Sequence, residues 1–218
     1  QRISELTNNG AQNHNYIVLD FSTPNKLELK LKEFIKKNSI NYDVIINNSG
    51  GPPSGELENA TTEDLLQAFN LHLISFHKIL GVLLGGIKNK ESGRIINIIS
   101  TSVKQPLNGL GVSNTIRGAV ANWAKTLANE LGPYNITVNN ILPGATNTGR
   151  LKEIINNKAQ KLNLKESTIE KQMADQVPLK RIAEPIEVAN AVVFLASNKA
   201  SYISGINLPV DGGRTKSL

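Results

Sequence analysis

Residues 94–117 read RIINIISTSVKQPLNGLGVSNTIR, and the fold follows from how this stretch is built. Its first part, residues 94–99, is an apolar run interrupted by Asn97, as is typical of a strand with both faces buried. Its last part opens a segment, residues 113–131, whose apolar side chains recur at helical spacing. These side chains are Val120, Ala124, Leu127 and Leu131. A buried strand followed by an amphipathic helix is the unit from which helix-covered parallel sheets are built.

The same alternation continues on both sides of this stretch. It predicts strands at residues 16–19, 44–46, 94–99, 136–141 and 206–210. It predicts helices at residues 25–37, 62–84, 113–131 and 185–196, with two weaker helices between 151 and 174. Because right-handed crossovers place helices on both faces, we expect one doubly wound α/β domain over residues 1–218 with a mostly parallel sheet. The polar segment 149–178 follows a strand end, and we interpret it as a mobile lid over a site.

The composition excludes several classes of protein. The chain has no cysteine, which excludes a disulfide scaffold and a thiol nucleophile and fits the reducing cytoplasm. The net charge of +6 comes from lysines spread over helix faces, so we expect no nucleic-acid partner and a mild attraction for anionic cofactors. The longest apolar run, residues 74–87, contains His77 and Lys78, so we expect no membrane span. His14, His72 and His77 lack metal-ligand spacing, so we expect no metal site.

Polar and turn-forming residues follow four of the predicted strands. Asp20 follows the first, residues 47–50 the second, Ser100 the third, and Pro143 with Gly144 the fourth. In a parallel sheet these positions share one edge, where ligands bind beyond the carboxyl ends of the strands. The alternative is that turns need glycine, asparagine and proline in any case. The pattern therefore indicates a ligand site without identifying the ligand.

In this order, the residues resemble the short-chain dehydrogenase/reductase family, and they are most similar to its 3-oxoacyl-carrier-protein-reductase-like members. The resemblance implies a Rossmann-like fold that binds NAD or NADP. It implies contacts to the cofactor from Asp20, from the Asn47-Asn48-Ser49-Gly50 motif, and from the loop containing Pro143, Gly144 and Thr148. It also implies that Asn70 is the asparagine of the active site and that Ser100 is the catalytic serine.

The sequence departs from the family at its N-terminal end. No stretch resembles the family's first strand and its glycine-rich phosphate loop, and Gly109-Leu-Gly111 follows no apolar strand. We therefore expect further sequence before Gln1. We interpret residues 1–10 as the tail of a helix with Ile3 and Leu6 facing inward.

The second departure lies in the catalytic pair, where the family's tyrosine and lysine fall on Ser113 and Arg117. A serine hydroxyl is far less acidic than a phenol, and an arginine stays charged and cannot shuttle protons. Ser113 and Arg117 are four residues apart on a helix and share a face, which Ser100 should meet from the strand end. Two hydroxyls and a guanidinium suit a carboxylate or phosphate, and Lys104 could add positive charge there.

Two functions from different classes follow. The first is an NAD(P)(H)-dependent oxidoreductase acting on carbonyl and alcohol groups of a small, acidic substrate, in which Ser100 and Arg117 polarise the oxygen. The alternative is a catalytically silent homologue that binds a ligand or partner. Two structural interpretations also stay open: Ser100 as a turn residue, and Arg117 as a surface or interface salt-bridge residue. The resemblance further implies a homodimer or homotetramer.

Overall fold

The computed structural model describes residues 6, 14–38, 40–90 and 92–217. The sheet has four parallel strands in the order β1-β2-β3-β4. They are β1 (Val44–Asn47), β2 (Gly93–Ile98), β3 (Ile136–Pro143) and β4 (Asn207–Val210). The predicted α/β fold with a parallel sheet is confirmed.

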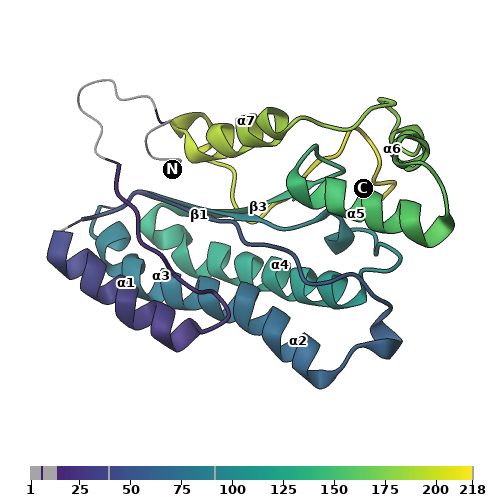
Figure 1. Cartoon of the computed structure of the whole chain (residues 1–218). Helices are drawn as coiled ribbons and strands as arrows, with labels where there is room; N and C mark the ends of the chain where they lie inside the picture. Colours follow the sequence, from purple (N-terminus) through teal and green to yellow (C-terminus); the bar gives the residue numbers. More distant parts are fainter. Residues whose placement is uncertain (1–5, 7–13, 39, 91, 218) are drawn as a thin grey trace.

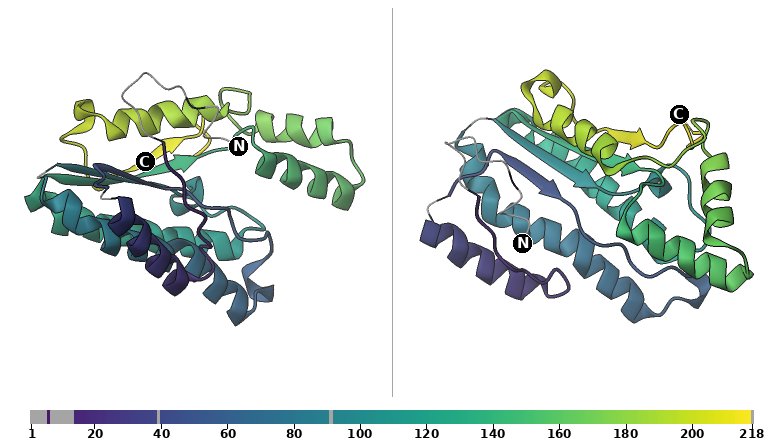
Figure 2. Two further views of the ribbon diagram at one scale, coloured as in Figure 1. Left: turned by 60° about the vertical axis from the view of Figure 1, so that its left-hand side comes forward. Right: turned by 45° about the horizontal axis from the view of Figure 1, so that its top comes forward.

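Helices cover both faces of this sheet (Figures 1 and 2). On one face lie α1 (Pro24–Asn38), α3 (Ser75–Lys88) and α4 (Gly111–Leu131), and on the other lies α7 (Pro185–Ala196). The segment 149–178, which we interpreted as a lid, contains α5 (Gly149–Leu162) and α6 (Glu166–Asp175). These two helices pack against each other. The predicted helices are therefore present, each within a few residues of its expected ends.

Both faces of β2 are buried, which explains why the sequence around residue 95 is apolar and does not alternate with polar residues. The side chain of Ile95 belongs to a buried cluster with Leu80 and Ala124 from α3 and α4. The next side chain, Ile96, belongs to a cluster with Leu195 of α7 on the opposite face. Because successive side chains of a strand point to opposite faces, a strand between two helical layers must be apolar throughout.

The strand predicted at residues 16–19 is wrong. This segment is irregular and pairs with no strand of the described chain, and the side chains of Tyr16 and Val18 are 75% and 76% exposed. A strand needs a neighbour for its backbone hydrogen bonds, and β1 pairs with β2 alone among the described strands. The helix tail predicted at residues 1–10 lies largely outside the described residues. Leu6 is 50% exposed, so its predicted inward position is wrong.

The helix predicted at residues 62–84 is divided by a π-helical turn. Helix α2 (Thr62–Phe69) is followed by the π-helix η3 (Asn70–Ile74), and α3 continues the same axis. The whole stretch, Thr62–Lys88, is long and apolar enough to cross a membrane, contrary to our expectation. In this chain 28% of its apolar window is buried, and the stretch packs against α1 and α4 through residues that include Phe76 and Ile87.

A chain of asparagine side chains crosses the entire sheet. Asn47, Asn97, Asn140 and Asn207 occupy the same register on the four strands. Each amide nitrogen donates to the side-chain oxygen on the next strand, over 2.8, 2.9 and 2.8 Å. We call these four residues the asparagine ladder. Because each member satisfies its neighbour inside the core, the ladder stabilises one register of the sheet over all others.

Gly111, at the start of α4, is required by close packing against the backbone of Leu57. A Cβ at Gly111 would lie 2.6 Å from the Leu57 nitrogen and 2.5 Å from its Cβ. We therefore expect Gly111→Ala to lower the free energy of unfolding by about 1–3 kcal/mol, measured by urea denaturation. The control is Gly118→Ala on the same helix, where the Cβ meets no described atom within 4 Å. That variant should gain roughly 0.5–1 kcal/mol from helix propensity, and equal stability of both variants would contradict the packing argument.

Candidate active site

Ser100 lies directly beyond the carboxyl end of β2. It caps the short helix η4 (Thr101–Val103), and its Oγ accepts a hydrogen bond of 3.1 Å from the backbone N–H of Ser102. The side chain is half-buried. Ser100 is therefore a turn residue, as one interpretation expected, and its side-chain oxygen forms the cap. Its hydroxyl proton is still available to a ligand, because the recorded bond uses only an oxygen lone pair.

Helix α4 brings Arg117 to the same strand end. The Arg117 guanidinium is 7% exposed, and its Nη1 donates a 2.8 Å hydrogen bond to the carbonyl oxygen of Ile98. Ile98 is the last residue of β2, and Ser100 follows it by two residues. Ser113, half-buried, lies one helical turn before Arg117 on α4. The structure thus brings Arg117 to the end of β2, two residues before Ser100.

The charge of Arg117 is buried without a balancing carboxylate. No ion pair of Arg117 exists within the described residues, and its Nε is buried without a hydrogen-bond partner there. The interpretation of Arg117 as a surface salt-bridge residue is therefore wrong, and an ion pair across an interface stays a prediction. Burial lowers the Arg117 pKa to about 10. The group is still a cation at neutral pH.

The loop after β1 lies over this guanidinium. Asn47 is buried in the asparagine ladder, whereas Asn48 and Gly50 are exposed. A Cβ built on Gly51 would lie 4.0 Å from Arg117 Nη2, so the loop passes next to the cation. A Cβ on Gly50 would meet nothing within 4 Å of the described chain, so the outer side of the loop is open to a ligand.

His72 is a member of this cluster that the sequence did not reveal. It lies in the π-helix with 0% exposure, and a 2.7 Å hydrogen bond joins its Nδ1 to Ser49 Oγ. Asn70, two residues earlier, is half-buried, and no side-chain hydrogen bond is recorded for it in the described part of the chain. One signal was present in the sequence: His72 stands at helical spacing from Phe69 and Phe76, on the inward stripe.

The Pro143–Gly144 turn lies at the carboxyl end of β3, at the same edge of the sheet as Ser100. The Gly144 N–H donates to the Val210 carbonyl, and a Cβ at Gly144 would lie 2.8 Å from Asp211 Cα. Thr148 caps α5, where its hydroxyl accepts from the N–H of Leu151. The Pro143–Gly144 turn and Thr148, both expected to contact the cofactor, therefore lie at the two ends of the loop that joins β3 to α5.

Two other predicted residues are placed differently. Asp20 is exposed and follows no strand, and its carboxylate accepts hydrogen bonds from the N–H and hydroxyl of Ser22. These bonds hold the Asp20 pKa below its usual value. Lys104 follows η4, and its backbone carbonyl accepts a 3.5 Å hydrogen bond from the Ser217 hydroxyl of the C-terminal tail. Neither side chain has a recorded contact with Ser100, Ser113 or Arg117 in the residues described.

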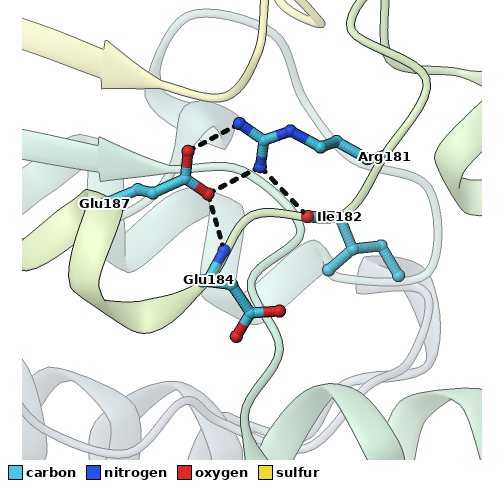
Figure 3. A network of polar contacts seen from close by, with 4 residues as sticks. All are labelled: Arg181, Ile182, Glu184 and Glu187. Atoms are coloured by element: carbon cyan, nitrogen blue, oxygen red, sulfur yellow. Dashed lines mark hydrogen bonds and ion pairs between the residues drawn. The ribbon is translucent and has the colours of Figure 1, made fainter.

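The segment 149–178 is tied to the rest of the fold at both ends. At its start, Arg150 donates a 3.0 Å hydrogen bond to the Pro52 carbonyl, just beyond the loop over Arg117. After its end, Arg181 forms a two-pronged ion pair with Glu187, which also accepts from the Glu184 N–H (Figure 3). The Arg181 hydrogen bonds lower the Glu187 pKa to about 2. That these anchors support a mobile lid stays a prediction.

Comparisons with known proteins agree with this architecture. A sequence profile described as enoyl-(acyl carrier protein) reductase matches residues 1–215. The chain is 33% identical to the NADPH-dependent reductase BacG of Bacillus subtilis (strain 168) over 176 residues, covering 81% of this chain and 68% of that protein. It is 35% identical to the 3-oxoacyl-[acyl-carrier-protein] reductase FabG of Buchnera aphidicola subsp. Baizongia pistaciae over 211 residues, covering 95% and 78%.

Among solved structures, a short chain dehydrogenase family protein from Francisella tularensis superposes with a TM-score of 0.87. The sequences are 27% identical, and the match covers 94% of this chain and 83% of that one.

Proposed function

Because the chain belongs to the short-chain dehydrogenase/reductase family, we propose that it is an NAD(P)(H)-dependent oxidoreductase that interconverts carbonyl and alcohol groups without the family's tyrosine and lysine. The relatives named as reductases support this function. The observation that carries the proposed site is the buried, unpaired guanidinium of Arg117 at the strand end that leads to Ser100. A cation in such a position favours negative charge on a bound ligand.

The residues around Arg117 fit the nicotinamide end of the cofactor. The open outer side of Gly50 leaves room above the loop, and Nη2 of the Arg117 guanidinium is the nitrogen that lies beside Gly51. Asn48, Pro143 and Thr148 would complete this side of the site, and Asn47 would hold the loop through the ladder. When bound, NAD(P)H supplies a hydride. The relative named as an NADPH-dependent reductase favours NADPH.

In the proposed reaction, the chain's residues polarise the carbonyl oxygen. Ser100 donates its hydroxyl proton as a hydrogen bond to this oxygen, while its Oγ accepts from the Ser102 N–H. Ser113 offers a second hydroxyl, and Arg117 stabilises the negative charge that develops on the oxygen. Because neither serine nor arginine is acidic near neutral pH, the proton comes from water or from an acidic group of the substrate. Asn70, the first residue of the π-helix, would position the part of the site that this helix contributes.

We propose an acidic carbonyl compound as the substrate class. A buried cation with no carboxylate partner in the described chain is stabilised when an anion binds beside it. The net charge of +6 attracts such substrates, and Lys104 would extend the positive region. We place the enzyme in the cytoplasm, where a chain without cysteine fits the reducing conditions. The exposed side chains of Ile186 and Val193 on α7 favour a homo-oligomer.

The test is oxidation of NADPH and NADH by the full-length protein over paired carbonyl substrates. Each pair contains an oxo acid and a neutral ketone of similar size, and 3-oxoacyl thioesters are assayed beside the pairs. We expect turnover with NADPH at about 1 s⁻¹ or faster, and a higher kcat/KM for the acidic member of each pair. Tight NADPH binding without turnover of any member would instead favour a catalytically silent homologue. Equal rates within every pair would contradict the substrate class alone.

A further inference from the structure

His72 occupies an unusual point of the backbone. The π-helix Asn70–Ile74 interrupts an otherwise α-helical stretch, and such turns are frequent at functional sites. His72 is the histidine at its centre, and its side chain is fully buried. A polar side chain is costly to bury there unless its hydrogen bonds are satisfied, so its partners indicate its role.

The imidazole of His72 is held in place from two directions. Its Nδ1 shares the 2.7 Å hydrogen bond with Ser49 Oγ, and Phe76 contacts the ring edge-on with centroids 6.2 Å apart. Its Nε2 is buried without a partner in the described chain, and the Nε of Arg117 is in the same condition. The π-helix packs against α4, the helix that carries Arg117. Ser49, His72 and Arg117 therefore belong to one buried cluster.

The chemistry of this cluster requires a neutral ring at position 72. Burial, together with the positive charge of Arg117, lowers the His72 pKa to about 3. The imidazole is thus uncharged at neutral pH, and it hydrogen-bonds the loop without neutralising the guanidinium. A carboxylate at position 72 would pair with Arg117 and remove the charge that the proposed site needs.

We propose that His72 is a positioning residue: through Ser49 it holds the Asn47–Gly51 loop against Arg117 and so maintains the cofactor side of the site. This inference rests on the proposed function for its consequence, but the contact itself exists in the ligand-free chain. Within residues 47–51 there are two side-chain anchors, the asparagine ladder at Asn47 and His72 at Ser49, and Arg150 holds the Pro52 carbonyl just beyond them. Loss of the His72 anchor leaves residues 48–51 held only from their two ends, so they can move away from Arg117.

The experiment compares Ser49→Ala, His72→Phe and the double variant with the wild-type chain. Ser49→Ala removes only the hydroxyl, and His72→Phe keeps a ring in an apolar setting while removing both nitrogens. The matched control is His77→Phe, the same substitution on the same helical stretch, where the histidine is exposed and bonded to Trp123. Ser49→Thr, which keeps the hydroxyl, is the rescue variant.

The first measurement is amide hydrogen exchange in the ligand-free full-length protein. We expect exchange at residues 48–51 to accelerate about tenfold in Ser49→Ala and in His72→Phe, because one buried hydrogen bond is lost. His77→Phe and Ser49→Thr should exchange as the wild type does. The double variant should match His72→Phe, because Ser49 acts through His72. Unchanged exchange, or an additive double variant, would overturn the proposal.

The second measurement links the anchor to the cofactor. The Kd for NADPH, measured by fluorescence titration, and the KM for NADPH should each rise three- to tenfold, with kcat at saturating NADPH within about twofold of wild type. A lower kcat with unchanged Kd would contradict positioning of the loop. A wild-type chain that binds no NADPH would defeat the proposed function, and the exchange result would still decide the loop anchor. Should His72→Phe fail to fold, Ser49→Ala alone decides.

Discussion

Arg117→Met is expected to lower kcat/KM for an acidic carbonyl substrate by about 10²–10³-fold, the usual cost of removing one preorganised group that stabilises developing charge. The substitution keeps the first part of the apolar stem of the side chain, ends near the position of Nε, and removes the cation. We expect the same substitution to raise the free energy of unfolding. Burial of the unpaired cation lowers its pKa to about 10. Such a shift corresponds to roughly 3 kcal/mol, from which the lost hydrogen bond to the Ile98 carbonyl subtracts about 1 kcal/mol.

Arg117→Met should therefore lose activity without losing stability. The measurements are initial rates of NADPH oxidation and the free energy of unfolding in urea. The control Arg117→Lys keeps the charge but offers one point donor instead of a fork, and we expect an intermediate loss of roughly tenfold. Wild-type rates in Arg117→Met would show that Arg117 has no part in the reaction. A parallel loss of stability and activity would make it a structural residue.

Asn97→Leu is expected to have the largest effect on stability. Asn97 accepts from Asn47 and donates to Asn140, so its replacement leaves two buried polar groups unpaired. Each unpaired group costs about 1–3 kcal/mol, and we expect the free energy of unfolding to fall by about 4 kcal/mol. That is a large fraction of the roughly 5–15 kcal/mol by which domains are stable. Urea denaturation measures this change.

Asn207→Leu serves as the control for the ladder. Asn207 lies at the end of the ladder on β4, is half-buried, and accepts one hydrogen bond, from Asn140. Its replacement should cost about 1 kcal/mol. If Asn97→Leu and Asn207→Leu have the same stability, the ladder does not act as a connected chain of bonds and the argument from register fails.

Most helices and strands could be predicted because their signals are local. The periodicity of apolar residues over 113–131 and the apolar run at 94–99 both follow from two-sided burial, and both elements are present as α4 and β2. Residues 16–19 have the same apolar character, yet they form no strand. The two segments differ in their neighbours in the fold. A strand requires an adjacent strand to complete its hydrogen bonds, and the sequence of four residues does not indicate whether an adjacent strand exists.

The candidate site was predictable in part for the same reason. Ser100 and the Asn47–Gly50 motif follow strands, and a parallel sheet brings such positions to one edge whatever their sequence separation. Whether Arg117 was a surface ion-pair residue or a buried cation could not be read from its position on α4. That depended on the carbonyl of Ile98 and on Gly51, which belong to other elements.

The amino-acid sequence was sufficient to predict the layered α/β architecture and the edge of the sheet that holds the candidate site. Folding in three dimensions decided which polar groups meet. It joined Ser49 to His72 across 23 residues and linked Asn97 to partners 50 and 43 residues away. The physical reason is that periodicity reports which face of an element is buried, whereas a hydrogen bond depends on the atom that another element places opposite.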